Sequence, residues 1–105
     1  MSLNDLIRRT WMENAKIALE LADQLVAYRA TLPAEASEVG ETTTRARDAA
    51  HRLAGSLGMY GLREGSELAS LLEDQFRLGR SDVMSGAEFA RTAQRLRQII
   101  VEAQV

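Results

Sequence analysis

Apolar residues recur every three or four positions along the first third of the chain, which is the spacing of one face of an α-helix. The stripe shifts around Trp11 to Ala15, so the pattern predicts one long helix or two helices joined by a bend. Pro33 ends the segment, because a proline forces the preceding residue out of the α region. Ser2 is the predicted N-cap of this helix, because Asp5 follows it at the third position, as in a capping box. The stripe consists of Leu3, Leu6, Ile7, Trp11, Ala18, Leu21, Ala22, Leu25, Tyr28 and Leu32.

Three further amphipathic segments follow, separated by short polar or glycine-containing stretches. The second helix is predicted to end at residues 58–61. The third is predicted to run from about residue 62 to 78, with Gly79 as its C-terminal αL residue. The fourth is predicted to begin at the capping box of residues 85–88. Few β-branched clusters are left to form strands. The pattern predicts an all-α antiparallel four-helix bundle and one domain over residues 1–105. The inward stripes are Ala46, Ala49, Ala50, Leu53 and Leu57, then Leu68, Leu71, Leu72, Gln75 and Phe76, and last Phe89, Ala93, Leu96, Ile99, Ile100 and Ala103.

Composition and charge exclude several classes of function. The net charge of -2 and the pI near 5.4 argue against a nucleic-acid-binding protein, which usually has a basic excess. The absence of cysteine excludes disulfides and thiolate metal sites, and a single histidine disfavours zinc. No apolar run approaches the ~18 residues of a membrane span, and no signal peptide is visible. We therefore expect a cytoplasmic protein, or a soluble module of a larger one, that binds neither nucleic acid nor membrane. We also expect the protein to be a monomer.

The single histidine, His51, is predicted to lie at the edge of the buried stripe of the second helix and to face outward. The next positions on its face are Ala54, Gly55 and Gly58, where a surface helix usually has long polar side chains. Each interior glycine destabilises a helix by about 0.5–1 kcal/mol relative to alanine, so two beside one histidine indicate a special role. They clear an approach for the backbone of another protein, let a neighbouring helix pack closely, or simply fray the end of the helix.

The stretch around this histidine resembles a known family signature. Residues 50–62 read Ala-His-Arg-Leu-Ala-Gly-Ser-Leu-Gly-Met-Tyr-Gly-Leu. This closely resembles the pattern of histidine-containing phosphotransfer (HPt) domains, His-x-Leu-Lys-Gly-Ser with a further glycine ten residues after the histidine, here Gly61. The resemblance implies that His51 accepts a phosphoryl group at Nε2 from a receiver aspartyl phosphate and passes it to another receiver aspartate. Neutral imidazole is a nucleophile near pH 7, as this role requires.

The resemblance also assigns supporting residues. Family members often have Glu or Gln twenty-two residues after the histidine to accept a hydrogen bond from Nδ1, and Glu73 stands there; alternatively, Glu73 pairs with Arg77 on the helix surface. Many relatives have lysine three residues after the histidine as a partner for the phosphoryl group, whereas this chain has Ala54. Arg47, Arg52 and Arg77 are the candidate cations instead, because a phosphoryl group carries close to two negative charges.

Other residues of the stretch are assigned to docking or to structure. Ala54, Gly55 and Gly58 form the expected docking face for a partner. The Ser56 hydroxyl is expected to bond backbone near the helix end, and Gly61 is expected to provide a tight turn or a positive φ.

The chain has no glycine-rich nucleotide loop or Walker lysine, so it should not bind ATP or phosphorylate itself. The implied function is a phosphorelay intermediate and not an enzyme. Its partner is the receiver domain of a response regulator or hybrid sensor kinase, which supplies the acidic pocket and Mg²⁺. No cofactor or metal is expected on this chain. Two alternatives are a helical interaction or scaffold module that has lost phosphotransfer, and an oligomerisation bundle without a site.

Overall fold

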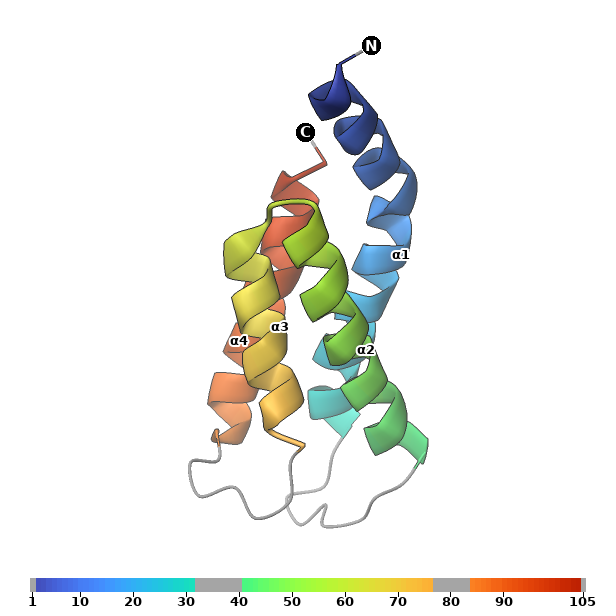
Figure 1. Ribbon diagram of the computed structural model, residues 1–105. Helices are drawn as coiled ribbons and strands as arrows, with labels where there is room; N and C mark the ends of the chain where they lie inside the picture. The colour runs from blue at the N-terminus through green and yellow to red at the C-terminus, as the bar shows by residue number, and fades with distance from the viewer. Residues whose placement is uncertain (1, 32–40, 77–83, 105) are drawn as a thin grey trace.

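The computed structural model describes residues 2–31, 41–76 and 84–104, and only the backbone of residues 29–31, 41 and 42. These residues form four helices: α1 (Leu3–Thr31), α2 (Glu41–Met59), α3 (Arg63–Asp74) and α4 (Gly86–Glu102). Successive helices run in opposite directions, and α1 and α3 each pack against both α2 and α4 (Figure 1). The predicted all-α, antiparallel four-helix bundle is confirmed.

The first helix is continuous through the point where its apolar stripe shifts. The alternative of two separate helices joined near Trp11–Ala15 is therefore wrong. Trp11 and Ala15 are both buried, and Trp11 Nε1 donates a hydrogen bond to the carbonyl of Ala103 at 3.0 Å. The Trp11 ring also lies 5.3 Å from that of Tyr60. Trp11, Ala15, Ala18, Ala22 and Leu25 are all buried, at intervals of four and three residues, so the buried face of α1 continues through this point.

The first two turns of α1 extend past the ends of the other helices, as the dark blue ribbon in Figure 1 shows. Leu3, Leu6 and Ile7 are consequently 71%, 50% and 38% exposed, so these three residues of the apolar stripe do not belong to the core. The N-cap is as predicted, because the Asp5 amide donates to the Ser2 hydroxyl at 3.1 Å.

The third helix is shorter than predicted in the part of the chain that the structure describes. It ends at Asp74 and is followed by a turn, while Gly79 and Pro33 both lie outside the described residues. Its buried positions are Gly65, Ala69 and Leu72. Leu71 is 42% exposed, so its inward prediction is wrong, because neighbouring positions on a helix point about 100° apart.

The fourth helix begins at the predicted cap. The Glu88 amide donates to the Ser85 hydroxyl at 3.1 Å, which satisfies one of the free amides of the first turn. Phe89 takes part in a cluster with Tyr28 and Phe76, whose ring centroids are 5.3 to 6.1 Å apart. This aromatic cluster closes the end of the core opposite Trp11.

The core between the helices consists mainly of leucine and alanine. Each fully buried leucine contributes about 1.5–3 kcal/mol of transfer free energy, and the small alanines of α2 let its neighbours approach closely. The side chains with no more than 2% exposure are Ala15, Ala22, Leu25, Ala46, Ala49, Ala50, Leu53, Leu57, Ala69, Leu72, Ala93, Leu96 and Ile100.

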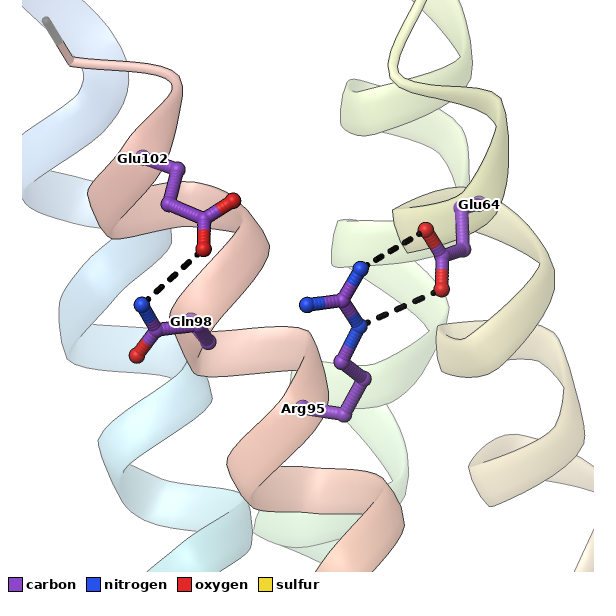
Figure 2. Close-up of polar contacts among 4 residues, drawn as sticks. All are labelled: Glu64, Arg95, Gln98 and Glu102. Atoms are coloured by element: carbon purple, nitrogen blue, oxygen red, sulfur yellow. Dashed lines mark hydrogen bonds and ion pairs between the residues drawn. The ribbon is translucent and has the colours of Figure 1, made fainter.

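Among the described residues, two ion pairs connect α4 to its neighbours across the surface. Arg95 donates from Nε and Nη2 to the two carboxylate oxygens of Glu64 on α3, at 3.2 and 3.1 Å (Figure 2). These hydrogen bonds and the charge of Glu64 raise the pKa of Arg95. Arg97 Nε lies 2.7 Å from Asp23 Oδ1 on α1. All four side chains are about half exposed, so the pairs orient α4 and add little stability.

Gly65 provides a test of how closely the helices pack. A Cβ at this position would lie 2.9 Å from Leu57 Cδ1 and 3.4 Å from Ile99 Cγ2. We expect Gly65→Val to lower the free energy of unfolding by about 1–3 kcal/mol, because the added atoms overpack a filled core. Urea denaturation followed by circular dichroism measures it.

The control for this experiment is Gly55→Ala. A Cβ at Gly55 has no heavy atom within 4 Å, so the change should raise the free energy of unfolding by about 0.5–1 kcal/mol. Equal denaturation midpoints for the two variants would contradict this account of the packing.

Candidate functional site

His51 projects from α2 away from the core, while its neighbours Ala50 and Leu53 are fully buried. Its side chain is 74% exposed. Nδ1 lies 2.8 Å from Oε2 of Glu73, which is in the last turn of α3. Nε2 has no hydrogen-bond partner among the described residues. The imidazole is therefore held at one nitrogen and open at the other.

This contact selects one form of the neutral ring. An ionised carboxylate only accepts hydrogen bonds, so the ring proton belongs on Nδ1 and the lone pair on Nε2. The Glu73 side chain is 33% exposed, so water only partly surrounds the carboxylate. Arg77, the alternative partner of Glu73, lies outside the described residues. An exposed Nε2 lone pair can attack an electrophilic centre that a partner brings to it.

The two glycines beside His51 have different surroundings. A Cβ at Gly55 would meet open space, whereas a Cβ at Gly58 would lie 3.3 Å from the hydroxyl oxygen of Ser66 on α3. Gly55 therefore fits the interpretation of a cleared approach, and Gly58 fits the interpretation of close helix packing. Ala54, directly before Gly55 in the sequence, is half-buried against the core.

The candidate cations are placed differently around the histidine. Arg47 is one turn before His51 on the same face of α2, and Arg52 is about 100° round the helix from it. Both arginines are exposed, and neither forms an ion pair with a described carboxylate. Arg77 lies outside the described residues. Of the described candidates, Arg47 is the one on the histidine face.

The turn after the histidine helix contains the two residues assigned to structure. Gly61 has φ of +79°, a conformation that glycine adopts without strain. The Leu62 amide donates to the Leu57 carbonyl at 2.9 Å, which closes the helix end and starts the chain back along α3. The Ser56 hydroxyl has no recorded hydrogen bond with a described residue. Near the site, the serine hydroxyl that bonds backbone is that of Ser66.

Ser66 and Gly65 are the residues near the site that sequence reasoning missed. The Ser66 hydroxyl donates to the Ala54 carbonyl at 2.7 Å, across the contact between α2 and α3. One signal for Ser66 was available: it stands seven residues before Glu73, and therefore on the same face of α3.

The described ranges contain neither a metal-ligand cluster nor a membrane-spanning helix. No group of three or more His, Cys, Asp or Glu side chains there is placed to hold a metal ion. No helix there has the length and apolar character needed to cross a bilayer.

Comparison with known proteins gives one match. The family model of the Hpt domain matches residues 6–104, nearly the whole chain. No curated protein and no solved structure matches. Hpt domains carry phosphoryl groups on histidine in phosphorelays, interact with receiver domains and act as carriers rather than as true enzymes. From its sequence match and its antiparallel bundle of helices, this chain belongs to the Hpt domain family.

Proposed function

We propose that this protein is a phosphorelay intermediate in which His51 Nε2 carries the phosphoryl group. The observation that supports the proposal is the 2.8 Å contact from His51 Nδ1 to Glu73, with Nε2 free of any described partner. A ring fixed at Nδ1 has its lone pair on the exposed nitrogen, which is the nucleophile that the transfer needs.

The transfer balances without a further reactant. The Nε2 lone pair forms a P–N bond while the P–O bond to the receiver's aspartyl carboxyl breaks, and that electron pair leaves with the carboxylate. Nδ1 keeps its proton, and the positive charge that develops on the ring faces Glu73. Attack by a second receiver's aspartate on the phosphohistidine reverses these changes. Mg²⁺ bound in the receiver neutralises charge on the phosphoryl oxygens.

The proposed cation for the phosphoryl group is Arg47, with Arg52 and Arg77 as the other candidates. Arg47 is exposed on the same face as His51 and has no carboxylate partner among the described residues. Its planar guanidinium suits two-point contact with phosphoryl oxygens. In this proposal an arginine one turn before the histidine does the work of the lysine that Ala54 replaces.

The proposed docking face for the receiver contains Ala54, Gly55 and Gly58. Gly55 is exposed and has open space where a side chain would be, so a partner backbone can approach the imidazole there. Gly58 is exposed as well, and its missing side chain also accommodates Ser66. The second candidate function is an interaction module that has lost phosphotransfer, and the observation that favours it is alanine at position 54.

Phosphoryl transfer can be tested directly at the histidine. Incubation with a phosphorylated receiver domain, chosen from a panel from the same organism, should give an acid-labile, base-stable label. His51→Gln should abolish the label and keep the helical circular dichroism of the parent. Because His51 is the only histidine of the chain, any phosphohistidine signal reports on it. Equal labelling of variant and parent would disprove the assignment, and an unlabelled parent that still binds receivers would favour the interaction module.

The role of Glu73 can be tested by the tautomer of the imidazole. In the parent at alkaline pH, ¹⁵N chemical shifts of the ring should show the proton mainly on Nδ1. Glu73→Ala should move the proton toward Nε2, because the acceptor is gone. The matched control is Glu67→Ala, an exposed glutamate of the same helix that makes no recorded contact with His51. If Glu73→Ala leaves the tautomer ratio unchanged, the assignment of Glu73 as the Nδ1 acceptor is wrong.

The open space at Gly55 can be tested by filling it. Gly55→Gln should weaken receiver binding about tenfold, or ~1.4 kcal/mol, in a calorimetric titration, because a long side chain then occupies the approach to His51. The matched control is Ala87→Gln, at an exposed position in α4, the helix diagonally across the bundle from α2. If both variants bind as the parent does, the docking face is elsewhere.

A further inference from the structure

The contact between α2 and α3 contains two pairs of facing residues in the same register. His51 faces Glu73, with Nδ1 and Oε2 2.8 Å apart. Gly58 faces Ser66, where a Cβ on the glycine would be 3.3 Å from the hydroxyl oxygen. His51 and Gly58 are seven residues apart on α2, and Ser66 and Glu73 are seven apart on the antiparallel α3. The two pairs are therefore two helical turns apart, about 10 Å, along one seam.

At the Gly58–Ser66 pair, a hydrogen bond joins the two helices directly. The Ser66 hydroxyl donates to the carbonyl of Ala54 at 2.7 Å. Ala54 lies one turn after His51, so this bond fixes the position of the α2 backbone beside the histidine and not that of a flexible side chain. The missing side chain at Gly58 leaves the room that Ser66 occupies. Ser66 is half-buried and Ala54 is half-buried, so water competes only partly for this bond.

We infer that Ser66, accommodated by Gly58, is a positioning residue for the phosphoacceptor, since it sets the register in which Glu73 meets Nδ1 of His51. The inference rests on the proposed function of His51. Helices are stiff over two turns, so a shift of α3 at Ser66 moves the base of Glu73 by a similar amount. Hydrogen bonds weaken steeply when their distance and angle depart from the optimum. The Ser66 bond thereby acts on the imidazole through Glu73, without touching it.

The test replaces Ser66 with alanine and measures the ring itself. Ser66→Ala should shift the neutral tautomer of His51 from Nδ1–H toward Nε2–H in ¹⁵N spectra. It should also slow phosphorylation of His51 by phosphoramidate, a small donor that needs no receiver, about two- to tenfold, as expected for the loss of one hydrogen bond. Ser70→Ala is the matched control, an exposed serine one turn further along α3 with no recorded hydrogen bond, and should change neither quantity.

Two more variants keep the test decisive. Ser66→Thr retains the hydroxyl and should keep more of the parent's tautomer ratio than Ser66→Ala does. Gly58→Ala keeps Ser66 but crowds it, and should shift the ratio in the same direction as Ser66→Ala, which decides the question if Ser66→Ala fails to fold. An unchanged tautomer ratio in the folded Ser66→Ala variant, or an equal change in Ser70→Ala, would overturn the inference.

The tautomer measurement separates this inference from the proposed function. If no receiver labels the parent but Ser66→Ala moves the ring proton, the proposed function fails and the positioning role stands. If receivers label the parent and Ser66→Ala leaves both the ring proton and the phosphoramidate rate unchanged, the positioning role alone fails.

Discussion

The hydrogen bond between His51 and Glu73 depends on how closely α2 and α3 approach each other. A carboxylate on a side chain of limited length reaches Nδ1 at 2.8 Å only if the two backbones are near and in register. The sequence meets this requirement with small residues along the contact. Gly58 leaves room for Ser66, and Gly65 leaves room for the end of Leu57. Each glycine weakens its helix by about 0.5–1 kcal/mol relative to alanine, and this cost accompanies the close approach of the two helices.

The other two helices, α1 and α4, support the α2–α3 pair from the side of the core. α1 and α4 pack against each other and against the α2–α3 pair, and they are anchored at both ends. At one end Trp11 bonds the Ala103 carbonyl and contacts Tyr60, and at the other end three aromatic rings pack together. In the proposed function the partner supplies most of the catalysis, so the main task of this structure would be to keep an exposed nucleophile in a fixed orientation. A stable core behind an exposed histidine meets that need.

The sequence predicted those features that follow from local rules. The helix periodicity gave the bundle, and the caps at Ser2 and Ser85 are where the sequence places them. The periodicity failed at Leu3, Leu6 and Ile7, because an apolar face shows which side of a helix is hydrophobic but not where its neighbours end. The proximity of Glu73 to His51 was expected from the family resemblance and not from spacing alone, since spacing says nothing of how two helices align.

The glycines show most clearly what a sequence leaves open. Gly55 and Gly58 both lie on the face of His51, and spacing gave no reason to separate them. Their roles differ because one faces solvent and the other faces Ser66, which is a property of the second helix and of the turn that sets its alignment. That turn depends on Gly61, whose φ of +79° returns the chain along α2.

Alanine at position 54 can be understood in the same terms. Its carbonyl accepts the Ser66 bond, and its side chain is half-buried against the core beside the contact between α2 and α3. In the proposed mechanism, a cation one turn before the histidine, at Arg47, reaches the phosphoryl group from the opposite side and leaves both the helix contact and the docking face undisturbed. The departure from the family pattern at Ala54 is therefore compatible with phosphotransfer, because the charge and the close packing are assigned to different residues.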